Sequence, residues 1–232
     1  MTDTSTAVPE LPTAAGNHRL PAAPPRPRVL PLALVCLLAT ALIGIATRAD
    51  VRRPFFQGLD ERWLGWMGGP HRGVYEAVAT VLNWFGGPLG VVVPLALLVA
   101  LLVLRRWWSV LYLLTTYLAA NMLVVQVLKQ VVDRPRPAHP LVRVDHGSFP
   151  SGHAAGAATL VVIVGVLLIP LARRRAWWLG GGLFVALMMW SRTWLHAHWL
   201  SDTVAGALAG AGTSLLLWWA FAPLLARERR AG

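Results

Sequence analysis

Three separated polar clusters carry the residue types that chemistry on a phosphate group needs. Guanidinium groups donate paired hydrogen bonds to phosphate oxygens, a glycine lets the backbone approach an anion, and a histidine near a carboxylate can act as nucleophile or base. These residue types together predict a phosphotransfer site. In chain order the clusters are Lys129 to Arg136-Pro137, then Pro150-Ser151-Gly152-His153, then Ser191-Arg192 with His198 and Asp202.

The first cluster closes a long apolar run. Lys129 is followed by Arg134 and Arg136, and each of these arginines precedes a proline. Because proline disfavours helical geometry in the residue before it, we expect the helix to end here and the arginines to lie on a stiff, extended exit. Taken alone, Lys129 would be a side chain snorkelling to the membrane interface. Arg134 is expected to make an auxiliary contact, or to pair with Asp133 or water.

The second cluster opens the next apolar run. Ser151 can cap a helix, Gly152 leaves room for an anion beside the backbone, and His153 stands in the first turn. The unpaired N–H groups of a helix start favour phosphate. The alternative is an ordinary serine cap with an interfacial histidine, which does not explain the cations that precede it.

The third cluster joins the last two apolar runs. His198 and Asp202 are four residues apart, so on a helix they share a face and the carboxylate can accept a hydrogen bond from one ring nitrogen. That bond would fix the tautomer and leave the other nitrogen free to attack. Arg192 adds a phosphate donor. Three other histidines receive no role, namely His139, His146 and His196.

The elements that position these clusters follow from composition. The chain is 56% hydrophobic and 13% charged, which predicts an all-α, polytopic membrane helical bundle. Six runs approach the about 20 residues that cross a bilayer, and short interfacial helices are expected in the connection from Arg48 to Gly87. The predicted spans are Leu30–Thr47, Pro88–Leu104, Trp107–Leu128, His153–Leu171, Trp177–Trp194 and Ser201–Ala222.

The chain divides into three parts. Residues 1–28 are rich in Pro, Ala and Thr and predict a disordered cytoplasmic tail, residues 29–226 form the six-helix domain, and residues 227–232 form a short basic cytoplasmic C-terminus. The first apolar run also resembles a signal peptide, although Arg48 makes a poor cleavage site. The single cysteine, Cys36, lies in an apolar run and is expected to serve packing.

Arginine clusters predict the orientation in the plasma (inner) membrane. They lie in the tail, at Arg105 and Arg106, at residues 173–175 and near the C-terminus, all on one side if there are six spans. Since basic residues near span ends stay in the cytoplasm, both termini are expected inside and the polar clusters on the extracytoplasmic face. The net charge of +11 therefore reflects orientation and not a nucleic-acid partner.

The three clusters together resemble the type 2 phosphatidic acid phosphatase (PAP2) superfamily, which also includes vanadium haloperoxidases. The family pattern is Lys, six residues, Arg-Pro; then Pro-Ser-Gly-His; then Ser-Arg, five residues, His, three residues, Asp, and every specified position matches. The resemblance implies catalysis through a phosphohistidine without metal or cofactor. His198 would attack, Asp202 would orient it, and His153 would act as acid and base. The implied phosphate-binding residues are Lys129, Arg136, Ser151, Gly152 and Arg192.

Substrate choice rests on analogy within the family. A site at the ends of membrane helices favours a lipid phosphate as partner, first a polyprenyl (undecaprenyl-type) diphosphate, otherwise phosphatidic acid or phosphatidylglycerophosphate. A lipid phosphotransferase, a transporter, a zinc enzyme, a haloperoxidase and a noncatalytic relative are the competing classes. Three cations near the histidines oppose a metal site, and internal repeats typical of transporters are not found.

Overall fold

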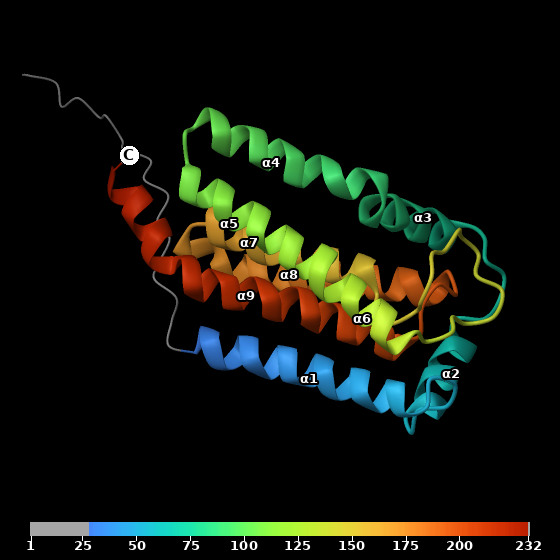
Figure 1. Cartoon of the computed structure of the whole chain (residues 1–232). Coiled ribbons are helices and arrows are strands. Elements are labelled where there is room, and N and C mark those ends of the chain that lie inside the picture. The colour runs from blue at the N-terminus through green and yellow to red at the C-terminus, as the bar shows by residue number, and fades with distance from the viewer. Residues whose placement is uncertain (1–27, 232) are drawn as a thin grey trace, which may run out of the picture.

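Helix α9 is the element around which the other helices pack. In the computed structural model, which describes residues 28–231, α9 contacts α1, α5, α7 and α8, and the helices run lengthwise beside one another (Figure 1). The predicted tail, residues 1–28, lies outside the described residues except for Arg28. The bounds are α1 (Val29–Ala49), α5 (Trp107–Tyr117), α7 (Gly152–Leu167), η3 (Leu171–Arg173), α8 (Arg174–Trp194) and α9 (Leu200–Ala231).

Each of the six predicted spans overlaps a helix or a continuous helical stretch, although the fourth, His153–Leu171, extends past the end of α7 at Leu167. The second consists of η1 (Pro88–Val91) and α4 (Val92–Val103), and the third runs unbroken through α5, the π-helical turns η2 (Leu118–Val124) and α6 (Val125–Val132). Three described stretches are long and apolar enough to cross a membrane, at 29–49, 107–132 and 200–230, while α4 and α7 are shorter apolar helices. The all-helical membrane bundle is thus confirmed, whereas the count of six crossings stays a prediction.

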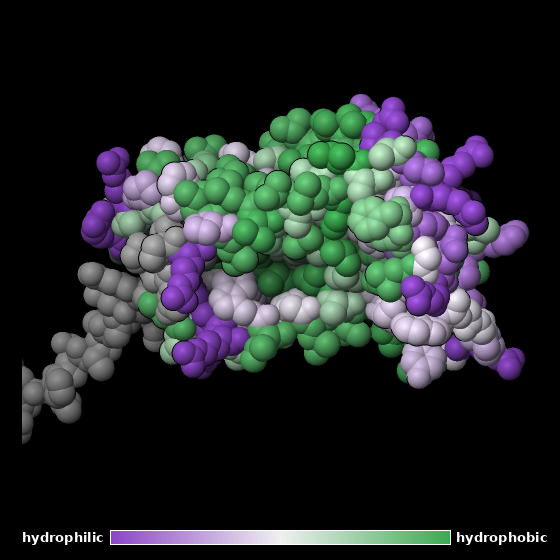
Figure 2. Space-filling model, turned by 90° about the horizontal axis from the view of Figure 1, so that it is seen from below, coloured by the Kyte–Doolittle hydropathy of each residue, from purple (hydrophilic) through white to green (hydrophobic). Residues whose placement is uncertain are grey.

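The outer surface of the bundle is apolar over its middle. Side chains such as Leu38, Ile45, Val103 and Leu183 are more than half exposed. Figure 2 shows hydrophobic residues across the centre of one face and hydrophilic residues gathered at its two ends. Such a belt would be unfavourable in water and is favourable against lipid tails.

Small residues let α7 and α9 approach until their backbones touch. A side chain carbon at Gly206 would lie 2.3 Å from the carbonyl oxygen of Ser151, and one at Gly210 would lie 2.2 Å from that of Ala155. The Ser151 N–H also donates to the carbonyl oxygen of Asp202 over 2.9 Å. Small residues allow close helix contacts in membranes. These glycines therefore let Ser151 of the second polar cluster lie directly against Asp202 of the third.

The far end of α9 is fastened to the start of α5. Glu228 accepts hydrogen bonds from the backbone N–H groups of Trp108 and Ser109 and pairs with Arg106 over 3.4 Å. A carboxylate at a helix N-terminus satisfies donors that the helix itself leaves unpaired. The predicted C-terminal segment 227–232 therefore continues α9 as far as Ala231.

The long connection after α1 contains α2 (Gln57–Trp66) and α3 (Val74–Gly86), so the two predicted helices are present. Arg134 ties α2 to the bundle. Its guanidinium, with the side chain only 1% exposed, pairs with Asp60 at 2.8 Å and with Asp202 at 2.7 Å. It also donates to Gln57 and Ser201. The expected pairing of Arg134 with Asp133 is wrong, because two buried carboxylates compensate its charge and Asp133 pairs with His146 instead.

We predict that Arg134→Ala destabilises the folded protein. Removing one partner of a buried ion network leaves the other charges uncompensated, which costs about 3–5 kcal/mol. The midpoint of thermal unfolding in detergent measures the effect. Arg143→Ala, at an exposed arginine, is the control and should unfold like the wild type. Equal midpoints for the two variants would contradict a structural role for the network.

Candidate active site

The three polar clusters meet at one end of the bundle. Lys129 lies in the last turn of α6, Ser151 immediately precedes α7, and His198 lies in the turn between α8 and α9. This is the end at which α2 and α3 lie, opposite the start of α1 and the end of α9 (Figure 1). The prolines act as predicted, since α6 ends at Val132 and Asp133 takes a left-handed conformation before the extended exit.

His198 is held in one tautomer by the backbone of the loop before α7. Its Nδ1 lies 2.7 Å from the carbonyl oxygen of Ser148. A carbonyl only accepts hydrogen bonds, so Nδ1 carries the proton and the lone pair is on Nε2. Nε2 lies 3.2 Å from Nη1 of Arg136, which can donate to it. The ring thus presents a lone pair beside a guanidinium, as a nucleophile toward a cation-bound phosphate requires.

Asp202 acts on His198 indirectly, which differs from the expected direct hydrogen bond. Its Oδ2 is 3.9 Å from Nδ1 of His198, too far for such a bond. The same oxygen accepts from the Ser148 hydroxyl and, at 3.0 Å, from the backbone N–H of Trp199. Asp202 therefore holds Ser148, whose carbonyl oxygen accepts the hydrogen bond from the His198 ring. It also holds Trp199, which follows His198 in the chain. No sequence pattern indicates Ser148, because its contact with His198 is through its backbone carbonyl oxygen.

Two cations of the first cluster share one acidic partner. The Lys129 ammonium lies 3.2 Å from both carboxylate oxygens of Asp145 and donates to the carbonyl oxygen of Gly147 at 3.0 Å. Arg136 pairs with the same carboxylate and also donates to Gly147 and Ala197. The side chain of Asp145 is 67% exposed, while that of Lys129 is 6% exposed. A solvent-exposed carboxylate thus neutralises cations that are themselves held in place.

Two buried donors near the histidines have no hydrogen-bond partner among residues 28–231. These donors are Nε of Arg192 and Oγ of Ser151, both inaccessible. Ser151 precedes α7 as predicted, but its hydroxyl makes no capping bond. Buried polar groups are nearly always satisfied, so unpaired donors at a cationic site fit the binding of an anion. The arrangement suits phosphate oxygens.

Asn83 on α3 connects the second and third clusters. Its side-chain oxygen accepts a hydrogen bond from Nη1 of Arg192, and its backbone carbonyl lies 3.3 Å from Nε2 of His153. A side chain carbon at Gly86, one turn further along α3, would lie 2.0 Å from the His153 ring. Sequence reasoning missed both residues. An asparagine inside the apolar run 81–85 was the available signal.

The charges at the site keep His198 neutral. Burial first, and then the positive charges of Arg192, Arg136 and Lys129, hold the pKa of His198 well below its usual range, with a smaller contribution from His153. A cation in this surrounding would be both desolvated and repelled. His198 therefore keeps its lone pair at neutral pH. The same electrostatic influence shows that residues from all three clusters lie near one another.

The remaining histidines lie elsewhere. His196 packs against the rings of His71 and, through it, Trp194, and His146 pairs with Asp133 at 3.1 Å. His139 is exposed. None of their three side chains forms a hydrogen bond or ion pair with a side chain of the predicted site in the described part of the chain, but the backbone carbonyl oxygen of His146 accepts a hydrogen bond from the Lys129 ammonium at 3.3 Å.

Comparison with known proteins gives consistent results. The chain is 29% identical over 112 residues to phosphatidylglycerophosphatase B of Bacillus subtilis (strain 168), a match that covers 46% of this chain and 55% of that protein. The chain thus spans about half the length of this curated relative. It also resembles the crystal structure of a transmembrane PAP2 type phosphatidylglycerolphosphate phosphatase from Bacillus subtilis, with a TM-score of 0.66, 22% identity, and coverage of 84% of this chain and 96% of that one.

The family assignment rests on half of the chain. Residues 109–225, from α5 to the last turns of α9, match the PAP2 superfamily, and this range contains all three polar clusters. The fold agrees, because the resemblance to the solved phosphatase covers 84% of this chain. The protein therefore belongs to the PAP2 superfamily, as its polar clusters indicated.

Proposed function

We propose that this protein is a membrane lipid phosphatase that works through a phosphohistidine on His198. The observation that carries the proposal is the neutral His198 ring, whose proton is held on Nδ1 by Ser148 while Nε2 faces Arg136. The family and the named function of the curated relative support hydrolysis of a phosphate ester.

The first step transfers the phosphoryl group to the protein. Nε2 of His198 attacks phosphorus with its lone pair, the bond from phosphorus to the leaving oxygen breaks, and that oxygen takes a proton from His153. Bound phosphate carries negative charge, which offsets the surrounding cations and favours a protonated His153. The products are a phosphohistidine and a lipid alcohol, or a lipid monophosphate when the substrate is a diphosphate.

The second step releases phosphate. His153, now neutral, takes a proton from water, and the resulting hydroxide attacks phosphorus as the bond to Nε2 breaks. The lone pair returns to His198 and the protein is restored. The residues proposed to hold the phosphate oxygens and stabilise their charge in both steps are Lys129, Arg136, Arg192, the hydroxyl of Ser151 and the N–H of Gly152. The chain supplies these charges from its own side chains, which is the basis for proposing catalysis without a metal.

The substrate is proposed to be a glycerolipid phosphate. The relative named phosphatidylglycerophosphatase B favours phosphatidylglycerophosphate, and phosphatidic acid has the same ester type. The polyprenyl diphosphate expected from the sequence remains the second candidate, because a site at the end of membrane helices would accept either headgroup. An assay must therefore offer both classes.

The site is proposed to face the extracytoplasmic side of the plasma membrane. The arginines at 105–106 and 227–230 lie at the end of the bundle opposite the site, joined by the pair between Arg106 and Glu228 (Figure 1). Basic residues at span ends favour the cytoplasm. Both termini of the helical domain would then be cytoplasmic.

We predict that the purified protein releases phosphate from lipid phosphates in the presence of EDTA, and that His198→Ala loses this activity by about 10³-fold or more, because the attacking atom is gone. The assay measures phosphate from phosphatidylglycerophosphate, phosphatidic acid and undecaprenyl diphosphate. His139→Ala is the control, since that histidine is exposed and outside the site. Full turnover by a folded His198→Ala sample would exclude the proposed nucleophile.

His153→Ala should slow turnover by about 10²–10⁴-fold, the range for loss of a general acid and base. An ester whose leaving group needs no proton, such as p-nitrophenyl phosphate, should restore the first step but not the attack of water. The variant should then accumulate an acid-labile phosphohistidine, detected by ³²P labelling or mass spectrometry. Absence of this species, with p-nitrophenol still released, would contradict the double role.

The orientation predicts different labelling of two exposed positions. In a Cys36→Ala background, Arg143→Cys lies in the loop before α7 and should react with a membrane-impermeant maleimide in intact cells. Arg105→Cys lies at the opposite end and should react only after the cells are permeabilised. The reverse pattern would place the site in the cytoplasm.

A further inference from the structure

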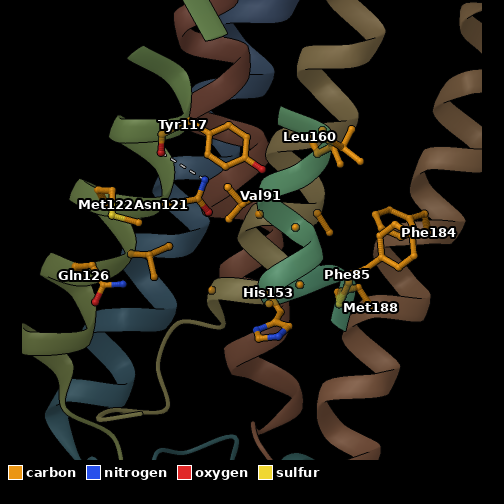
Figure 3. A pocket seen from close by; sticks show the side chains of 18 residues that line it. Phe85, Val91, Tyr117, Asn121, Met122, Gln126, His153, Leu160, Phe184 and Met188 are labelled. Atoms are coloured by element: carbon orange, nitrogen blue, oxygen red, sulfur yellow. Dashed lines mark hydrogen bonds between the residues drawn. The ribbon is translucent and has the colours of Figure 1, made fainter. Parts of the chain in front are cut away.

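A cavity of about 250 Å³ extends from His153 along the bundle, away from the phosphate-binding cations. One wall comes from the end of α3, η1 and the start of α4, and the opposite wall comes from α5, η2 and α6. The start of α7 lies between them, and Phe184 and Met188 of α8 close one side. Figure 3 shows His153 at one end of this cavity and Leu160 toward the other.

Polar side chains line one wall of this otherwise apolar cavity. Tyr117, Asn121 and Gln126 lie along one continuous helical stretch, as Figure 3 shows. Residues five apart in a regular α-helix point about 140° away from each other. The wider π-helical turns at 118–124 allow Asn121 and Gln126 to line the same cavity. Such turns occur often at functional sites.

These polar groups lack strong partners within the described part of the chain. The Asn121 amide donates a long bond of 3.4 Å to the carbonyl oxygen of Tyr117, and its side-chain oxygen accepts none. The Gln126 amide and the Tyr117 hydroxyl have no hydrogen bond to any other described residue. Inside a membrane helix such groups are costly unless something satisfies them, and they commonly mark a binding site.

The position of His153 indicates which part of a substrate would enter the cavity. His153 is proposed to protonate the leaving oxygen, so the part of the substrate attached to that oxygen lies on its side of the phosphate. The cavity is the space next to it. Val91 and Met122, on opposite walls, are 63% and 60% exposed, so alkyl chains can leave the cavity between η1 and η2 into lipid.

We propose that this cavity is a leaving-group site that recognises the oxygen-bearing glycerol backbone of a glycerolipid phosphate through Asn121 and Gln126. The ester and hydroxyl oxygens of a glycerolipid can pair with both amides. The leaving group of a polyprenyl monophosphate carries only hydrocarbon beyond its leaving oxygen and would leave both amides unsatisfied, and burying unpaired polar groups discriminates against such a substrate. The inference rests on the proposed phosphatase activity and names its preferred substrate class.

The test compares two monoesters that differ in the leaving group. Dioctanoyl phosphatidic acid carries ester oxygens, and farnesyl monophosphate does not. For Asn121→Leu, the ratio of kcat/KM for the first substrate to that for the second should fall about 5- to 50-fold relative to the wild type. Gln126→Leu, at an exposed position where folding is less at risk, should lower the same ratio.

Gln130→Leu is the matched control, because Gln130 is an exposed amide on α6 that does not line the cavity. Its ratio should stay at the wild-type value. An unchanged ratio in both Asn121→Leu and Gln126→Leu would overturn the assignment of the cavity, even if total activity fell. A wild type that hydrolyses neither monoester would instead reject the proposed phosphatase activity, so the two failures are distinguishable.

Discussion

The buried guanidinium of Arg134 is the interaction on which the arrangement of the site depends. It joins Asp60 of the first long connection to Asp202 at the start of α9. Its own backbone carbonyl accepts a hydrogen bond from the N–H of Ser148 at 2.8 Å. A charge this deeply buried must be compensated, so the three segments have little freedom to separate. The His198 ring is hydrogen-bonded to the Ser148 carbonyl oxygen and lies near Asp202, so this network fixes its position.

The arginines at the site differ in whether protein groups satisfy them or leave them open to a ligand. Arg134 is satisfied entirely by protein groups apart from its Nε, and it stays inaccessible to a ligand. Arg192 retains an unpaired Nε, and Arg136 approaches the lone pair of His198. Arg134 and Arg136, each of which precedes a proline, thus have different surroundings. Burial and partners distinguish them, since the side chains are chemically identical.

The sequence sufficed to predict the helices, the end of α6 at the prolines and the meeting of the three polar clusters. These features depend on local composition or on spacing within one segment. It did not predict the roles of Ser148, Asn83 and Asp60. Ser148 holds His198 through a carbonyl that every residue possesses, and Asp60 meets Arg134 across 74 positions of chain. The π-helical turns that contain Asn121 could not be predicted either, because the apolar pattern of that stretch fits a regular α-helix.

The pairing of Asp145 with Lys129 and Arg136 changes how a phosphate can bind. In the proposed mechanism, an incoming phosphate does not meet bare cations but exchanges with the carboxylate of Asp145, which is tethered to the chain. The affinity for phosphate is therefore the difference between two electrostatic attractions, that of the cations for phosphate and that of the same cations for Asp145. After turnover the exchange runs backward, and an anion that cannot diffuse away takes up the vacated charges. In this proposal, cations that stabilise a reacting phosphate would therefore not hold the inorganic phosphate that turnover releases.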